Sequence, residues 1–166
     1  MSATDMRTKR LNLIARTKDD ATAMVDAMSP SEKEQLSADW LARLAASNFA
    51  DPWTHGFSLV HRGTGDVIGM CGFKAPPAAD GAVEIAYGVD LDQQGKGYAT
   101  EAAVALVVFA FGDRRVRVVR AHTLPESNAS TRVLTKCGFL YIGEFVDPED
   151  GLVWRWEIHQ QEGAVS

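Results

Sequence analysis

The chain has 166 residues, 46% of them hydrophobic and 23% charged, and a formal net charge of −5. These values are typical of an ordinary globular protein, and the length fits a single domain over residues 1–166. The longest apolar run, residues 102–112, is far shorter than the roughly 20 residues that cross a bilayer, so we expect no membrane-spanning helix.

The first half of the chain predicts a strand, a helical region and a hairpin. Period-two and helical spacing place a strand at 10–16, helices at 19–28 and 31–49, and hairpin strands at 56–62 and 67–74. The helical region is expected to end by Asp51-Pro52, and Ser29 or Ser31 to cap the second helix beside Pro30.

The second half alternates strands and helices. The expected elements are a strand at 82–90, a helix at 97–112, a strand at 114–123, a helix at 126–137, and hairpin strands at 139–146 and 152–160. Gly138 should cap the second of these helices, and residues 147–151 should form the hairpin turn. The order β-α-α-β-β-β-α-β-α-β-β predicts an α/β (α+β) fold with a mixed central sheet of about six to seven strands flanked by helices.

Other features indicate compartment and partners. The N-terminal residues lack the apolar core of a signal peptide, so we expect a cytoplasmic protein, and Cys71 and Cys137 are expected to be free thiols. The arginines of residues 114–120 alternate with valines, which favours a strand over a nucleic-acid patch. Widely spaced histidines predict no metal site. The acidic balance favours cationic small molecules or basic peptides as partners through long-range steering.

A glycine-rich turn at residues 94–99 precedes the apolar helix. A helix start presents unpaired N–H groups and the positive end of its dipole, and small residues let a phosphate approach them. A Walker A string is absent, and a dinucleotide fingerprint lacks both its third glycine near Thr100 and its acid after the next strand. A pyrophosphate cradle and a connection without a ligand both remain open.

Several short motifs occur in a fixed order along nearly the whole chain. They are KRLNLIAR, GDVIGMCGF, VEIAYGVD, QGKGYATEA, NASTRVLTKCGF and IGE. Gln94, Gly97 and Ala99 have the spacing of motif A of the GNAT superfamily of acyl-CoA N-acyltransferases, after a strand that ends in valine. The chain resembles that superfamily and, within it, the Rim-type branch related to ribosomal-protein N-terminal acetyltransferases.

The resemblance implies acetyl-CoA as co-substrate. The pyrophosphate would then lie on the glycine turn, which here comprises Gln94, Gly95, Lys96, Gly97, Tyr98, Ala99 and Thr100. The pantetheine amides would pair with the main chain of Val89, Asp90 and Leu91, with the acetyl carbonyl near the Val89 N–H. Asn128 and Ser130 match a pair that lies beside the pantetheine and the sulfur.

Glu84 is the candidate base. An amine with a pKa near 10 is mostly protonated at pH 7, so its attack on a thioester needs a proton acceptor. Glu84 interrupts an apolar strand and shares one face with Ala86 and Gly88, which leave room for a substrate. The alternative is that Glu84 only pairs with a basic side chain on an adjacent strand.

The sequence leaves two candidates for the group that protonates the leaving thiolate. Many superfamily members use a tyrosine four residues before the Gly-Phe pair, where this chain has Leu134. Ser130 is the substitute we expect, with a water as the alternative. Both Asn128 and Ser130 could also be ordinary helix-start residues.

These features predict an N-acetyltransferase that moves an acetyl group from acetyl-CoA to a primary amine by direct attack in a ternary complex. The amine would belong to a protein N-terminus or to a small molecule, and the protein would be a monomer or a homodimer without a nucleic-acid or membrane partner. The alternatives are a non-catalytic acyl-CoA-binding regulatory module and a phosphate-binding scaffold unrelated to CoA.

Overall fold

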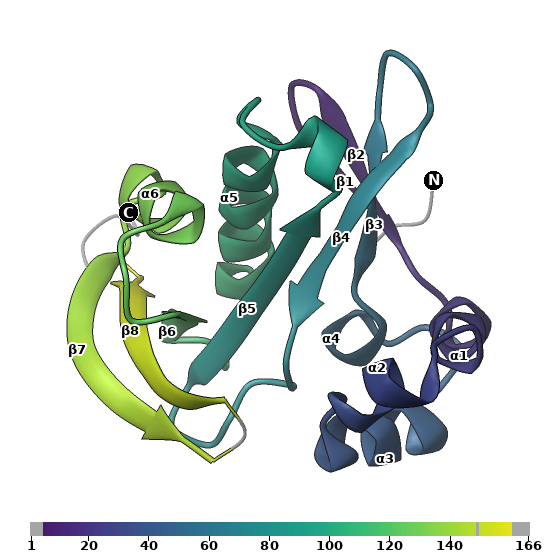
Figure 1. Cartoon of the computed structure of the whole chain (residues 1–166), viewed down its shortest axis with the longest axis horizontal. Coiled ribbons are helices and arrows are strands. Elements are labelled where there is room, and N and C mark those ends of the chain that lie inside the picture. The colour runs from purple at the N-terminus through teal and green to yellow at the C-terminus, as the bar shows by residue number, and fades with distance from the viewer. Residues whose placement is uncertain (1–4, 149, 161–166) are drawn as a thin grey trace.

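A computed structural model describes residues 5–148 and 150–160. In these residues one eight-stranded sheet has the order β1-β2-β3-β4-β5-β6-β8-β7, and only β5 and β6 pair in parallel (Figure 1). The strands are β1 Met6–Arg7, β2 Leu11–Ala15, β3 Phe57–His61, β4 Val67–Phe73, β5 Ala82–Val89, β6 Val118–Thr123, β7 Leu140–Asp147 and β8 Gly151–His159. The predicted mixed sheet is confirmed. The additional strand is β1, whose two residues are too short to show an alternating pattern.

The helices depart from the prediction in the N-terminal half. They are α1 Lys18–Asp26, α2 Pro30–Glu34, α3 Ala38–Ala46, α4 Pro52–His55, α5 Tyr98–Phe111 and α6 Ala129–Lys136, with a 3₁₀ turn, η1, over Leu91–Gln93. The single helix expected at 31–49 was wrong, because Ser37 accepts the N–H of Trp40 and starts a new helix. Pro52 begins α4 instead of ending the helical region, since proline suits a first helical turn.

Two smaller corrections concern the second half. The strand expected from residue 114 begins only at Val118, because Arg115 folds back onto Asp113 in the turn after α5. Cys137 is the C-cap of α6, and Gly138 follows it with a φ of 90°. The expected 147–151 turn lies partly outside the described residues. Both cysteines are free.

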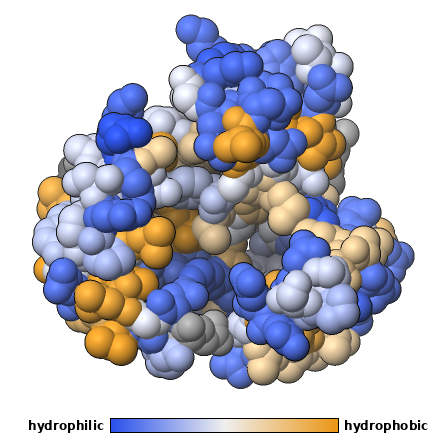
Figure 2. Space-filling view, viewed as in Figure 1, coloured by the Kyte–Doolittle hydropathy of each residue, from blue (hydrophilic) through white to orange (hydrophobic). Residues whose placement is uncertain are grey.

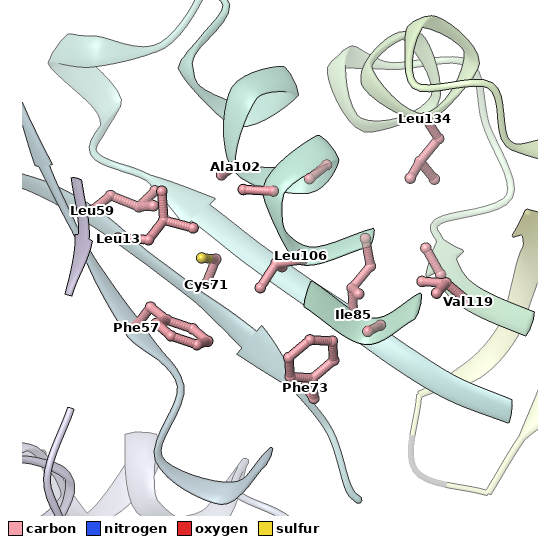
Figure 3. Close-up of a cluster of buried hydrophobic side chains, with 14 of the residues drawn as sticks. Leu13, Phe57, Leu59, Cys71, Phe73, Ile85, Ala102, Leu106, Val119 and Leu134 are labelled. Carbon is pink, nitrogen blue, oxygen red and sulfur yellow. The ribbon is translucent and has the colours of Figure 1, made fainter. Parts of the chain in front are cut away.

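The core lies between α5 and the strands. Ala102 and Leu106 of α5 are fully buried and face the side chains of β2 to β5, while Leu134 of α6 packs near Val119 (Figure 3). Helix α5 is apolar nearly all round and crosses between the two parallel strands, but it is buried only on the face toward the core, because Val104 and Val108 are exposed. This packing fixes the start of α5 relative to β5.

The strand β5 presents two different faces. Val83 and Ile85 are buried in the core, whereas Glu84, Ala86 and Gly88 lie on the opposite face, as the alternation predicted. Helices α1 to α4 gather at one end of the sheet (Figure 1). Within the described residues, no helix has the length and apolarity needed to cross a bilayer.

Candidate active site

The sheet opens between β5 and β6. Their ladder pairs only residues 82–84 with 118–120, and the strands diverge beyond Glu84 (Figure 1). The Asp90 N–H donates to the carbonyl of Ile68 in β4 at 2.8 Å. Because successive amides of a strand point to opposite sides, the Val89 N–H points away from β4 and into the opening. A backbone donor is therefore directed into the gap.

The glycine turn leads directly into α5. Gly95 and Gly97 have φ values of 79° and 88°, which favour glycine, and a Cβ at Gly95 would meet nothing within 4 Å. Gly97 is the N-cap of α5, and no side chain caps this helix. The first amides of α5 therefore keep their donor capacity for a ligand.

The connection between β1 and β2 holds the start of α5 in place. Glu101, in the first turn of α5, forms an ion pair with Arg10, and its carboxylate accepts the Thr8 hydroxyl at 2.7 Å. The Arg10 guanidinium also lies 4.5 Å from the centre of the Tyr98 ring. These contacts tie α5 to the residues between β1 and β2, so the turn rests on a rigid support.

A cavity of about 390 Å³ lies between β5, the glycine turn and α6, and we call it the α6 cavity. Eight residues expected at the co-substrate line it, namely Val89, Gln94, Gly95, Gly97, Tyr98, Ala99, Thr100 and Ser130. Four others do not line it, namely Asp90, Leu91, Lys96 and Asn128. Leu91 is 85% exposed in η1, and Asn128 caps α6 by accepting the Thr131 N–H at 3.1 Å.

The α6 cavity also contains residues that the sequence analysis did not assign. Arg132 and Lys136 of α6 line it and stand four residues apart, on one face of the helix. Two cations facing the glycine turn suit a ligand with several phosphate charges. The i, i+4 spacing is the sequence signal that could have identified them.

A second hollow lies on the other side of β5. It has a volume of about 240 Å³ and lies between β4, β5 and the N-terminal helices, and we call it the β4–β5 groove. The view in Figure 2 is hollowed between the sheet and these helices. Tyr87 and Gly88 line both the groove and the α6 cavity. A Cβ at Gly88 would meet nothing within 4 Å, so this residue leaves the groove open.

Glu84 is held by a lysine and a histidine. Its Oε2 lies 3.0 Å from the Lys74 Nζ and 3.0 Å from the His122 Nδ1, and Arg155 donates to the other ring nitrogen of His122 at 3.0 Å. Burial alone raises the pKa of Glu84, but His122 and Lys74 outweigh burial and leave that pKa below its ordinary value. The pairing with basic neighbours that the sequence left as an alternative is present. Glu84 lines neither hollow.

Tyr87 is a site residue that the sequence analysis missed. Its hydroxyl interacts with Ser130, and burial, followed by the neighbouring Cys137, raises the pKa of Tyr87 to about 12. The phenol therefore stays protonated near neutral pH and can donate. Leu134, at the usual tyrosine position, is fully buried in the core.

Comparisons with known proteins identify the family to which this fold and cavity belong. Residues 7–140 match the family described as the acetyltransferase (GNAT) domain.

The chain belongs to the GNAT acetyltransferase family.

The chain is 32% identical over 93 residues to the uncharacterized N-acetyltransferase p20 of Bacillus licheniformis, and the match covers 56% of this chain and 52% of p20. It thus spans about half the length of that curated relative. A GNAT-family acetyltransferase from Bacillus anthracis has the same fold, with a TM-score of 0.68, 20% identity and coverage of 94% and 98% of the two chains. The ribosomal L7/L12 acetyltransferase RimL, solved with coenzyme A, has a TM-score of 0.67, 15% identity and coverage of 92% and 95%.

The residues of this GNAT domain fit a CoA ester. Gly95 leaves open space where a side chain would stand, the α5 amides are uncapped, and Arg132 and Lys136 supply positive charge. Among the described residues, no cluster of three or more metal-ligating side chains accompanies them. The donor set is that of a site for an anionic organic ligand.

Proposed function

We propose that this GNAT protein transfers the acetyl group of acetyl-CoA to a primary amine by direct attack in a ternary complex. The observation that carries the proposal is the meeting of the α6 cavity and the β4–β5 groove at Tyr87 and Gly88. Two ligands that enter from opposite sides of β5 would meet there. Such an arrangement replaces a bimolecular encounter by a positioned one.

The co-substrate would occupy the α6 cavity. The amides at residues 97–100 would bind the pyrophosphate, with Arg132 and Lys136 adding charge-assisted contacts. When bound, acetyl-CoA supplies an acetyl group activated as a thioester. The Val89 N–H, directed into the opening, would donate to the acetyl oxygen, which gains negative charge during attack.

Proton transfers need two further groups. We assign Glu84 as acceptor of the amine proton, and because Glu84 lines neither hollow, the proton would reach it through water. Tyr87 of β5 and Ser130 of α6, both of which line the α6 cavity, would donate to the departing thiolate. The tyrosine that many relatives carry on the helix would then be replaced by one on the strand.

The first test is thiol release from acetyl-CoA over a panel of amines and N-terminal peptides. We expect amine-dependent release, and a Glu84→Gln variant should lose roughly 10²- to 10⁴-fold in rate because one positioned proton acceptor is worth about that much. Calorimetry with acetyl-CoA is the control for folding and binding. Binding without release for any amine would favour the regulatory module, and full activity in the variant would remove Glu84 from the mechanism.

A further inference from the structure

The β4–β5 groove has an unusual charge for a protein of net charge −5. Its walls are largely apolar, with Met24, Trp40 and Phe73 among them, and Arg16 is the one permanently charged side chain among the described residues that line it. No carboxylate is among these residues. The groove therefore has a positive local charge in an acidic molecule.

His55 adds no charge to the groove at neutral pH. Its ring is buried, lies 2.8 Å from the Ser47 hydroxyl and accepts the Asp51 N–H at 3.2 Å. Burial is the main cause that lowers the pKa of His55, and the nearby Asp51 offsets it only in part. The ring is neutral at pH 7, which leaves Arg16 as the charge that an acceptor meets.

Arg16 has only weak partners. Its Nη1 contacts the Met70 sulfur at 2.8 Å, its Nη2 donates to the Asp20 carbonyl at 3.3 Å, and its buried Nε has no partner. A thioether is a poor acceptor compared with a carboxylate, which can take two guanidinium N–H groups at once. The Asp20 carboxylate is already engaged by the backbone and hydroxyl of Thr17, and Arg16 lowers its pKa only as a lesser cause. An anion in the groove would thus gain a strong contact.

The cation also lies close to the proposed point of reaction. Met70, which contacts Arg16, stands directly opposite Gly88 in the β4–β5 ladder. Cross-strand neighbours of this kind have Cβ positions about 4.5–5.5 Å apart. Gly88 is where the two hollows meet, so an anion bound by Arg16 would lie about one side chain away from the amine under attack.

We infer that the acceptor is an amine that carries a carboxylate on a small apolar body, with Arg16 binding the carboxylate. This inference rests on the proposed function. The volume of about 240 Å³ is below the roughly 300–1,000 Å³ of pockets for drug-sized ligands, which suits an amino acid or the first residues of a peptide. The net charge of the whole protein favours cations only during encounter, whereas the groove decides which acceptor binds.

The test uses acceptor pairs in which an amide replaces a carboxylate. Because this replacement lowers the pKa of the neighbouring amine, kcat/KM is expressed for the unprotonated amine in each case. Thiol release from acetyl-CoA is measured with L-leucine against L-leucinamide, and with the peptides Ala-Asp-Ala-amide against Ala-Asn-Ala-amide. We expect kcat/KM to favour the carboxylate member of one pair by roughly ten- to hundredfold. The pair that shows the preference identifies a free amino acid or an acidic N-terminus as the source.

Arg16→Gln should abolish that preference. We expect KM for the carboxylate acceptor to rise by the same factor with kcat nearly unchanged, while the amide acceptor is unaffected, and Arg16→Lys should retain part of the preference. Arg114→Gln is the matched control, because Arg114 is exposed outside the groove and its loss changes the net charge equally. A preference that persists in Arg16→Gln, or none in the wild type, would overturn the inference.

A binding experiment separates this inference from the proposed function. Calorimetry with CoA present compares N-acetyl-leucine with N-acetyl-leucinamide, and the N-acetylated Ala-Asp-Ala-amide with the N-acetylated Ala-Asn-Ala-amide. None of these ligands needs turnover. Tighter binding of the acid that disappears in Arg16→Gln supports the groove as an anion site even if no amine is acetylated, in which case only the proposed reaction fails. Equal binding of acid and amide in both pairs rejects the role of Arg16 whether or not the enzyme is active.

Discussion

At the scale of single residues, Glu84 is both the candidate base and the centre of a charged cluster. A carboxylate paired with Lys74 and His122 is stabilised in its ionised form, and ionisation makes it available as an acceptor but a weak one. The same contacts hold its orientation. The two readings that the sequence left open, base and ion-pair partner, are therefore compatible in this geometry.

The pH dependence of the reaction distinguishes Glu84 from the substrate amine. Because its pKa is lowered below its ordinary value, Glu84 stays ionised as the pH falls from 9 to 5, and its charge is lost only in stronger acid. We expect kcat/KM to rise with pH up to the pKa of the acceptor amine. The rising limb of the pH profile should therefore move to higher pH when an amine of pKa near 10 replaces one of pKa near 8.

The comparison variant is Glu84→Gln, which should lower this curve without moving its limb. If the rising part of the kcat/KM–pH profile lies at the same pH for both amines, the ionising group belongs to the protein and not to the substrate. His122, in contact with Glu84, would then be the residue to replace next.

At the scale of elements, the start of α5 depends on local backbone geometry as much as on helix packing. Gly95 and Gly97 take left-handed conformations that carry the chain from η1 into the helix. Arg10 and Thr8 then hold Glu101 from the other side. The turn has both the shape and the support that a phosphate cradle needs.

Gly95 offers a test with an internal control. Gly65, in the turn between β3 and β4, has the same φ of 79° as Gly95, and a Cβ at either glycine would meet nothing within 4 Å. Alanine at either position should cost about 1–2 kcal/mol of stability through left-handed strain. Only Gly95→Ala should weaken acetyl-CoA binding, measured by calorimetry, because its added methyl group enters the α6 cavity. Equal weakening in Gly65→Ala would mean that strain, not the site, is responsible.

At the scale of the whole molecule, the two hollows meet where the sheet opens. The β5–β6 ladder ends at Glu84, so the α6 cavity lies in the divergence and the β4–β5 groove on the far side of the same strand. Helix α5 holds this arrangement because its side chains pack against several strands at once. A ligand of the site should therefore stabilise the entire fold.

Thermal unfolding measures that coupling. Acetyl-CoA at a hundred times its Kd should add about 2.7 kcal/mol of stability, which for a chain of this size raises Tm by about 5–10 °C. ADP, which shares the pyrophosphate but lacks the pantetheine arm, should stabilise less. An equal shift with ADP would favour the phosphate-binding scaffold over a CoA site.

The sequence by itself determined the order of the elements from β3 onward, the mixed sheet, the apolar character of α5 and the family. These features rest on local periodicity, turn residues and motif spacing, which each segment carries on its own. Ser130 and the glycine turn apart from Lys96, all expected at the co-substrate, line the α6 cavity. The break between α2 and α3 was missed because a serine cap competes locally with continued helical spacing.

Only the tertiary structure decided which distant side chains share a site. Lys74, just after β4, and His122 of β6 both reach Glu84, and Arg16 reaches the β4–β5 groove from just after β2. Such contacts join residues far apart in the chain, so no pattern within one segment indicates them. The net charge of −5 is a sum over the molecule, whereas the charge of the groove follows from which side chains the fold brings to it.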